Sequence, residues 1–280
     1  MTENLSLETE INLRGSAGTQ DPKLLWHVSL GDGPVVGVAT HAGHEMRPEL
    51  LSQLAIDEAT RIREEDPYTD FWTLACHSQI VARRSRFEID LNRPLEEAIC
   101  VQPEDCWNLK VWDAPIGQAA MERSRAEHRA FYDMFEEALR RIERRYGKFV
   151  IYDIHSFNHR RAGPHAAPAD PAANPEVNVG TGTLDRSRWG PLVDQFITDL
   201  REFDFVGDHL DVRENVNFRG RHLAEFVHRT FPENGCVLAV EVKKFFMDEW
   251  TGVGSPEHIN AMLEALRATI PGVVSALDRI

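Results

Sequence analysis

The chain has 280 residues and a formal net charge of −14, from 31 Lys and Arg residues against 45 Asp and Glu residues. Apolar residues make up 42% of it and charged residues 27%, which is typical of a folded protein and excludes a disordered or fibrous one. The negative charge argues against nonspecific binding to nucleic acids or anionic membranes, because both are polyanions. A small anionic substrate stays compatible with it, since a pocket can carry a local charge opposite to that of the whole protein.

Residues 1–20 have the character of a loose leader, and we expect residues 21–280 to form one α/β hydrolase domain. The first ten residues lack the basic start and apolar run of a secretory signal, and no apolar stretch approaches the roughly 20 residues of a membrane span. The four cysteines form no C-x-x-C pair, which disfavours a cysteine-based zinc site, and four cysteines in 280 residues are too few for a disulfide scaffold. We therefore expect a cytoplasmic protein without membrane or nucleic-acid partners, and a homo-oligomer stays open.

Strand-like and helix-like segments alternate along the chain. Short apolar runs predict buried strands over residues 35–40, 79–82, 148–154 and 237–242. Apolar residues at helical spacing predict helices over 48–59, 118–146, 191–203 and 220–231. Gly147 is suited to end the longest helix, and Ser255 followed by Pro256 is typical of the start of a last one. This alternation predicts an α/β fold with a mixed, largely parallel sheet.

No regular element fits residues 157–175, which contain four prolines and six alanines. This segment follows directly after His155, a candidate active-site residue. Long loops in compact domains are often functional lids, so we expect an active-site loop here.

Three predicted strands end in ionisable residues. His41 to Glu45 follow the first strand, His155 follows the strand over 148–154, and Glu241 lies near the end of 237–242. Sites in open α/β sheets form at the carboxyl ends of strands, where distant segments meet. Histidines and a carboxylate there suit a catalytic zinc ion, with a neighbouring carboxylate as base. Glu241 fits the base role, and an ion pair with Lys243, Lys244 or a distant arginine is an equally weighted alternative.

Four arginines lie within the twelve residues from Arg83 to Pro94 of this acidic chain. Arginine binds carboxylates through a bidentate fork, so the segment suits an acidic substrate. Without further indications, a solvated edge strand that neutralises nearby acids is the simpler interpretation.

Taken together, these residues resemble the N-formylglutamate amidohydrolase family. The similar segments are Thr40-His41-Ala42-Gly43, Ser85 to Pro94, Asp153-Ile154-His155-Ser156, Val177 to Thr181, Asn217 to Gly220 and Glu241 to Glu249. The segment from Ser85 to Pro94 is the most specific of them. The resemblance implies a three-layer α/β sandwich related to zinc carboxypeptidases, and a zinc-dependent hydrolase of N-acyl amino acids.

The resemblance also implies roles for individual residues. It gives His41 and His155 as metal ligands, Glu241 as the base, and Asn92 with Arg93 as the binding site for the substrate's α-carboxylate. Arg86 is expected near the scissile carbonyl or a side-chain carboxylate.

The third metal ligand is where the sequence departs from the pattern of those relatives. The position three after His41 is His44 rather than an acid, and the acid follows at Glu45. We prefer His44 because histidine is the more typical zinc ligand, and Glu45 remains the alternative. Asp66, in an acidic run before a proline, is predicted to lie in a solvated turn.

The predicted function is zinc-dependent cleavage of the N-acyl amide of an acidic amino acid such as N-formyl-L-glutamate, with one zinc ion per chain. Two alternatives stay open. The first is a metal-dependent deacylase or peptidase of another N-acyl amino acid, and the second is a catalytically silent protein that binds an anionic metabolite.

Overall fold

The computed structural model describes residues 25–280, so the predicted leader at 1–20 lies outside the described part of the chain. Its centre is a seven-stranded sheet with the order β1-β3-β2-β4-β7-β5-β6. The strands are β1 (Trp26–Ser29), β2 (Val35–Ala39), β3 (Ser78–Ala82), β4 (Phe149–Phe157), β5 (Val177–Gly180), β6 (Val212–Glu214) and β7 (Gly235–Lys243). Only the pairs β1–β3 and β5–β7 are antiparallel, which confirms a mixed and largely parallel sheet.

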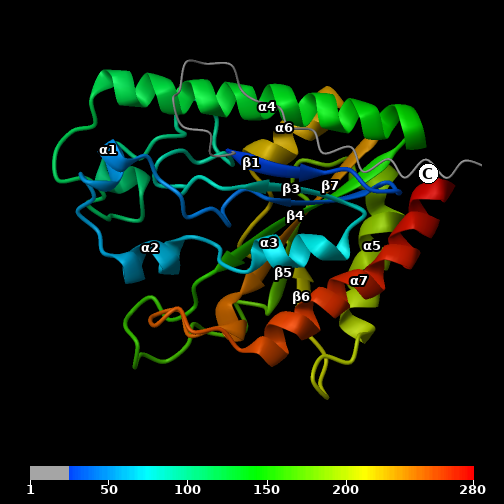
Figure 1. The fold of residues 1–280 in the computed structure, drawn as a ribbon. Helices are drawn as coiled ribbons and strands as arrows, with labels where there is room; N and C mark the ends of the chain where they lie inside the picture. The colour runs from blue at the N-terminus through cyan, green and yellow to red at the C-terminus, as the bar shows by residue number, and fades with distance from the viewer. Residues whose placement is uncertain (1–24) are drawn as a thin grey trace, which may run out of the picture.

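Helices cover both faces of the sheet, which gives the expected three layers (Figure 1). One face carries α4 (Gln118–Tyr146) and α6 (His222–Thr230), and the other carries α3 (Thr69–Trp72), α5 (Arg186–Glu202) and α7 (Pro256–Arg279). The connection from β2 to β3 also holds the short helices α1 (Pro48–Leu51) and α2 (Glu58–Glu64). Short 3₁₀ helices span Thr73–Ala75, Pro103–Asp105 and Lys244–Phe246.

Strand β4 shows how one segment serves both faces. Val150, Tyr152 and Ile154 pack into the core beneath α5 and α7, and Phe149 and Ile151 pack into the core beneath α4. Successive strand residues point to opposite faces, so the buried Asp153 and His155 lie on the same side of the sheet as Ile151. A strand buried along its whole length has room for such polar residues only where they find partners.

The long helices were predicted well. Helix α4 spans residues 118–146 as its apolar spacing indicated, and it ends at Gly147, whose φ is 78°. Helix α7 begins at Pro256, and the Ser255 side chain accepts a hydrogen bond from the backbone N–H of His258. Helix α5 begins five residues earlier than expected because Asp185 caps it at Ser187.

The helix predicted over residues 48–59 is wrong, because the structure has two short helices there. The backbone N–H of Ala55 donates to the carbonyl of Val111, so the intervening chain pairs with another loop instead of continuing α1. Asp57 then caps a new helix, α2, by accepting from the N–H of Thr60.

Sequence patterns also missed β1, β5 and β6, which contain only three or four residues each. Such runs are too short for a strand period to stand out. Cys100 and Cys106 form a disulfide in the loop before α4, with their Cα atoms 5.9 Å apart. Cys76 and Cys236 are free and buried.

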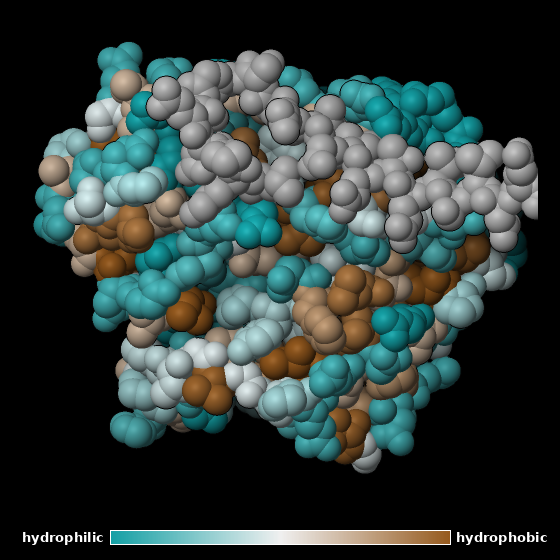
Figure 2. Space-filling model, viewed as in Figure 1, coloured by the Kyte–Doolittle hydropathy of each residue, from teal (hydrophilic) through white to brown (hydrophobic). Residues whose placement is uncertain are grey.

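Hydrophilic residues dominate the face drawn in Figure 2, where apolar residues appear only in separate groups. This agrees with a chain in which 27% of the residues are charged. Among residues 25–280, no helix is both long and apolar enough to cross a membrane.

Candidate active site

The parallel strands β2, β4 and β7 lie side by side and deliver three predicted site residues to one end of the sheet. His41 follows β2, His155 lies on β4, and Glu241 of β7 is the direct neighbour of His155 in the strand register. His41 and His155 are each 3% exposed, and both line one cavity with Glu241. The structure therefore brings together the two predicted histidine ligands and the predicted base.

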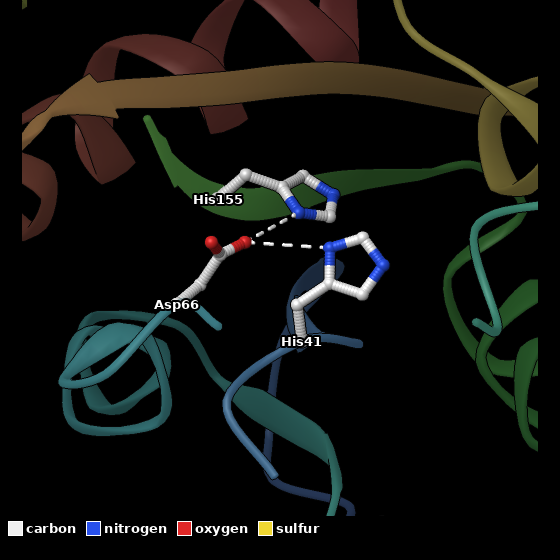
Figure 3. Close-up of side chains that lie close together, drawn as sticks. All are labelled: His41, Asp66 and His155. Carbon is white, nitrogen blue, oxygen red and sulfur yellow. Dashed lines mark hydrogen bonds and ion pairs between the residues drawn. The ribbon is translucent and has the colours of Figure 1, made fainter. Parts of the chain in front are cut away.

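Asp66 lies between the two histidines, where the sequence predicted a solvated turn. Its Oδ2 is 3.3 Å from Nδ1 of His41 and 3.2 Å from Nδ1 of His155, and its side chain is only 2% exposed (Figure 3). Its backbone N–H donates to the carbonyl of His41 at 3.0 Å, which fixes the segment after α2 beside the end of β2. The prediction for Asp66 is therefore wrong.

Carboxylates behind the histidines set the direction of both rings. Nε2 of His41 lies 2.7 Å from Oδ1 of Asp90, and Nε2 of His155 lies 2.9 Å from Oδ1 of Asp153. With Nε2 occupied in each ring, Nδ1 remains to face Asp66. This carboxylate–histidine arrangement is the one that orients histidine ligands in metal proteins.

The electrostatics of this cluster favour a positive charge between its members. Burial alone would raise the pKa of Asp66, but the hydrogen bond with His155 and the nearby His41 ring hold that pKa well below its usual range. Burial alone would lower the pKa of His155, but Asp153 and Asp66 raise it well above the ordinary value. The acids around His155 thus stabilise a positive charge beside its ring, which can be a proton or a metal ion.

His41, Asp66 and His155 form a donor set that suits a divalent metal ion. One ligand atom from each lies within 4.8 Å of the other two. Nδ1 of His41 is buried and makes no hydrogen bond with any residue in 25–280, although Asp66 is near. Two imidazoles and one carboxylate, with a fourth position left for water or substrate, are typical of catalytic zinc. These three residues therefore fit a catalytic zinc ion.

His44 and Glu45, the two candidates for the third ligand, lie apart from this cluster. Nε2 of His44 is 2.6 Å from Glu58, and its Nδ1 is hydrogen-bonded to Glu65, so both ring nitrogens are occupied. Glu45 pairs with Arg83 at 2.6 Å. The structure thus places Asp66, and neither of these two residues, beside His41 and His155.

Backbone hydrogen bonds hold segment 42–45 away from the cluster of His41, Asp66 and His155. It runs along residues 83–85, with the N–H of Glu45 bonded to the carbonyl of Arg83 and the N–H of Ser85 bonded to the carbonyl of Glu45. A Cβ atom at Gly43 would lie 2.3 Å from the carbonyl carbon of Arg83, so only glycine permits this approach.

The carboxylate of Asp90 organises the predicted substrate-binding residues. Its oxygens accept from Arg86 Nη2 at 3.0 Å and from the N–H of Asn92 at 2.9 Å, and Arg93 Nε lies 3.3 Å away. Burial alone would raise the pKa of Asp90, but His41, Arg86 and Arg93 hold that pKa well below its ordinary value. Asp90 belongs to the arginine-rich segment, but the pattern of that segment gave it no role.

The other side chains of the cavity wall come from distant loops. The guanidinium of Arg86 lies 4.7 Å from the ring centre of Trp107, which follows the disulfide residue Cys106. Asn158 and Arg161 come from the proline-rich loop, and both donate to Glu64. The sequence contained no pattern that distinguished Trp107 or Arg161 as site residues.

Burial raises the pKa of the Glu241 carboxyl to about 7, and Asp66 and Asp153 contribute to this shift. A carboxylate with a pKa close to neutrality can both accept and return a proton, as a general base must. The alternative of an ion pair is not found among residues 25–280. Lys243 Nζ donates to the carbonyl of Asn174, and Lys244 Nζ donates to the carbonyls of Arg63 and Glu65.

The model of the N-formylglutamate amidohydrolase family matches residues 33–246. The chain belongs to this family. An N-formylglutamate amidohydrolase from Ralstonia eutropha JMP134 is 18% identical, with a TM-score of 0.70 over 90% of this chain and 96% of its own. A gene product of Agrobacterium tumefaciens is also 18% identical, with a TM-score of 0.63 over 90% and 95%.

A metallo-carboxypeptidase from Burkholderia cenocepacia is a more distant match, with 14% identity and a TM-score of 0.38 over 89% of this chain and 60% of its own. No curated protein sequence matches the chain. The two structures with TM-scores of 0.70 and 0.63 establish the shared fold, and the family rests on the match over residues 33–246.

Proposed function

We propose that the protein is a zinc-dependent amidohydrolase that removes the acyl group, formyl in the simplest case, from an N-acylated acidic amino acid. The observation that carries this proposal is the buried cluster of His41, Asp66 and His155 beside Glu241. Membership of the N-formylglutamate amidohydrolase family supports the same reaction class.

The metal would be held by Nδ1 of His41, Nδ1 of His155 and a carboxylate oxygen of Asp66. When bound, zinc supplies Lewis-acid polarisation of the acyl carbonyl and lowers the pKa of a water molecule. Asp90 and Asp153 keep the imidazoles in the orientation that this ligand set needs.

Glu241 acts as the general base in this proposal. Its carboxylate takes the proton from the attacking water molecule and passes it to the nitrogen of the leaving amine, so the amide C–N bond breaks and a C–O bond forms. The raised pKa of Glu241 suits both transfers. Arg86, held between Asp90 and Trp107, is placed to stabilise the oxyanion that develops on the acyl carbonyl.

Asn92 and Arg93 bind the α-carboxylate of the substrate. The Asn92 side chain is fixed because its Oδ1 accepts a hydrogen bond from the N–H of Leu223, at the start of α6. Arg93 is held through its Nε near Asp90, which leaves its two outer nitrogens for a bidentate contact. Both residues line the same cavity as Glu241.

The test is a substrate panel with the purified protein. We expect release of formate from N-formyl-L-glutamate, loss of this activity with a chelator, recovery on addition of zinc, and one zinc ion per chain by metal analysis. N-acetyl- and N-succinyl-L-glutamate identify the preferred acyl group. A zinc-loaded protein that hydrolyses none of the three compounds would contradict the proposal and favour a silent binding protein.

A further inference from the structure

Five basic side chains line the cavity beside Glu241, and four of them already have partners. They are Arg86, Arg93, Arg161, Arg221 and Lys244. Arg86 and Arg93 share Asp90, Arg161 is paired with Glu64 at 3.2 Å, and Lys244 donates to two backbone carbonyls. A cation whose charge is matched by a protein carboxylate has less to offer an anionic ligand.

Arg221 is the exception. Its guanidinium makes no hydrogen bond or ion pair with any residue between 25 and 280, and its side chain is exposed where it borders the cavity. It directly precedes α6, two residues before Leu223, whose N–H bonds to Asn92. Arg221 is therefore only two residues from Leu223, which holds Asn92 in place. It comes from the start of α6 and not from the arginine-rich segment 83–94.

The charges of an acidic N-acyl amino acid favour a second cation on the cavity wall. Such a substrate has two carboxylates, and Arg93 with Asn92 accounts for one of them. Arg86 is engaged with Asp90 and stands near the reacting carbonyl, and Arg161 would first have to leave Glu64. Lys244 is buried and donates to two backbone carbonyls. Among the described side chains that line the cavity, Arg221 is therefore the remaining cation that can bind a second carboxylate without giving up an existing partner.

Resting on the function proposed above, we propose that Arg221 binds the side-chain carboxylate of the substrate and thereby selects acidic N-acyl amino acids. A guanidinium–carboxylate contact is charge-assisted and can be bidentate, so its loss affects a substrate with that carboxylate more than one without it. The role is one of substrate specificity, separate from the chemical step at Glu241.

The experiment compares N-formyl-L-glutamate with N-formyl-L-glutamine, which has the same shape and a neutral side chain. The measured quantity is the ratio of the two kcat/KM values. We expect Arg221→Gln to lower this ratio about 10- to 100-fold, as for the loss of a hydrogen bond between charged groups. Arg221→Lys should restore part of it, because lysine keeps the charge and loses the fork.

Arg219→Gln is the matched control. Arg219 is also exposed and lies two residues away, but it does not border the cavity. Its replacement should leave the ratio within about twofold of the wild type, since a solvated charge further from the ligand is screened. An unchanged ratio in Arg221→Gln, or an equal loss with both substrates, would overturn the assignment.

Calorimetric measurement of glutarate and butyrate binding tests the role of Arg221 independently of catalysis. Glutarate has two carboxylates and butyrate has one. We expect Arg221→Gln to weaken the binding of glutarate and to leave the affinity for butyrate nearly unchanged. Arg219→Gln should change neither affinity. If the wild type hydrolyses no N-acyl amino acid, the proposed function fails, but these affinities still decide the role of Arg221. Equal weakening of both acids, or no preference of the wild type for glutarate, contradicts it.

Discussion

His41 and His44 are only three residues apart in the sequence, but they belong to two histidine–carboxylate clusters that differ in burial and in the direction of their ring nitrogens. In the first, His41 and His155 both direct Nδ1 at Asp66, and all three side chains are buried. In the second, His44 lies between Glu58 and Glu65, with its side chain 41% exposed. His44 has a different carboxylate at each ring nitrogen, which suits it to hold a proton. His41 and His155 both turn Nδ1 toward the single carboxylate of Asp66, and three donors gathered at one point suit a metal ion.

The contrast shows that residue type and spacing near His41 do not identify the ligand. His44 has the more typical ligand side chain, but its nitrogens are used by two acids. Asp66 is distant in sequence, but a backbone bond to His41 brings it to the cluster. The direction of a donor atom decides whether it can serve a metal.

The largest effect is expected from Glu241→Gln, which removes the proposed base beside the first cluster. We expect kcat to fall about 10²- to 10⁴-fold, because glutamine cannot take the proton of water. Zinc content by metal analysis should stay at the wild-type level. Glu58→Gln is the matched change beside His44 and should leave kcat nearly unchanged. Comparable activity of the two variants would refute the base assignment.

Asp66→Asn tests the metal site itself. Changes to residues that merely support a ligand lower metal affinity about 10- to 100-fold, so loss of a ligand carboxylate should cost at least about 100-fold. His44→Gln should leave the zinc dissociation constant within about twofold. Competition with a chromogenic chelator measures both. If His44→Gln releases zinc and Asp66→Asn retains it, the ligand set is wrong.

The smallest effect concerns stability and pH in the second cluster. The hydrogen bond with Glu65 outweighs partial burial and raises the pKa of His44 above the ordinary value of about 6.5. The folded state therefore holds this proton more tightly than the unfolded state does. The resulting stabilisation is complete below about pH 6.5 and disappears as the pH rises through the raised pKa.

Urea unfolding of the wild type and His44→Gln between pH 5.5 and 9 measures this contribution. The difference in the free energy of unfolding should stay at or below about 1 kcal/mol, because solvent screens so exposed a pair. It should vanish at high pH. A difference that grows as the pH rises would show that His44 is stabilised as the neutral ring.

His41, His155 and Glu241 were predictable from sequence because a general rule places them. Each stands at or near the carboxyl end of an apolar strand, and parallel strands bring those ends to one edge of the sheet. The long helix α4 was predictable for a related reason, since 29 residues repeat its apolar spacing many times. A local pattern can be recognised in the sequence alone when it repeats many times. Site residues can be recognised when each stands at the end of a strand in a parallel sheet.

Asp66, Asp90 and Arg221 were not predictable because their roles depend on contacts between distant segments. An acidic run before Pro67 is typical of a solvated turn, and only the bond from Asp66 to His41 shows otherwise. Asp90 was one acid among several arginines. Arg221 differs from Arg219 only in bordering the cavity. Single-sequence patterns contain no such distances.

Residues 64–66 place three consecutive carboxylates with three different sets of partners. Glu64 accepts from Asn158 and Arg161, Glu65 from Ser85, and Asp66 faces the two histidines. Lys244 binds the carbonyls of Arg63 and Glu65 and so fixes where this stretch begins. An insertion or deletion of one residue here would move all three carboxylates away from their partners at once. The number of residues between α2 and Pro67 is therefore fixed by these contacts.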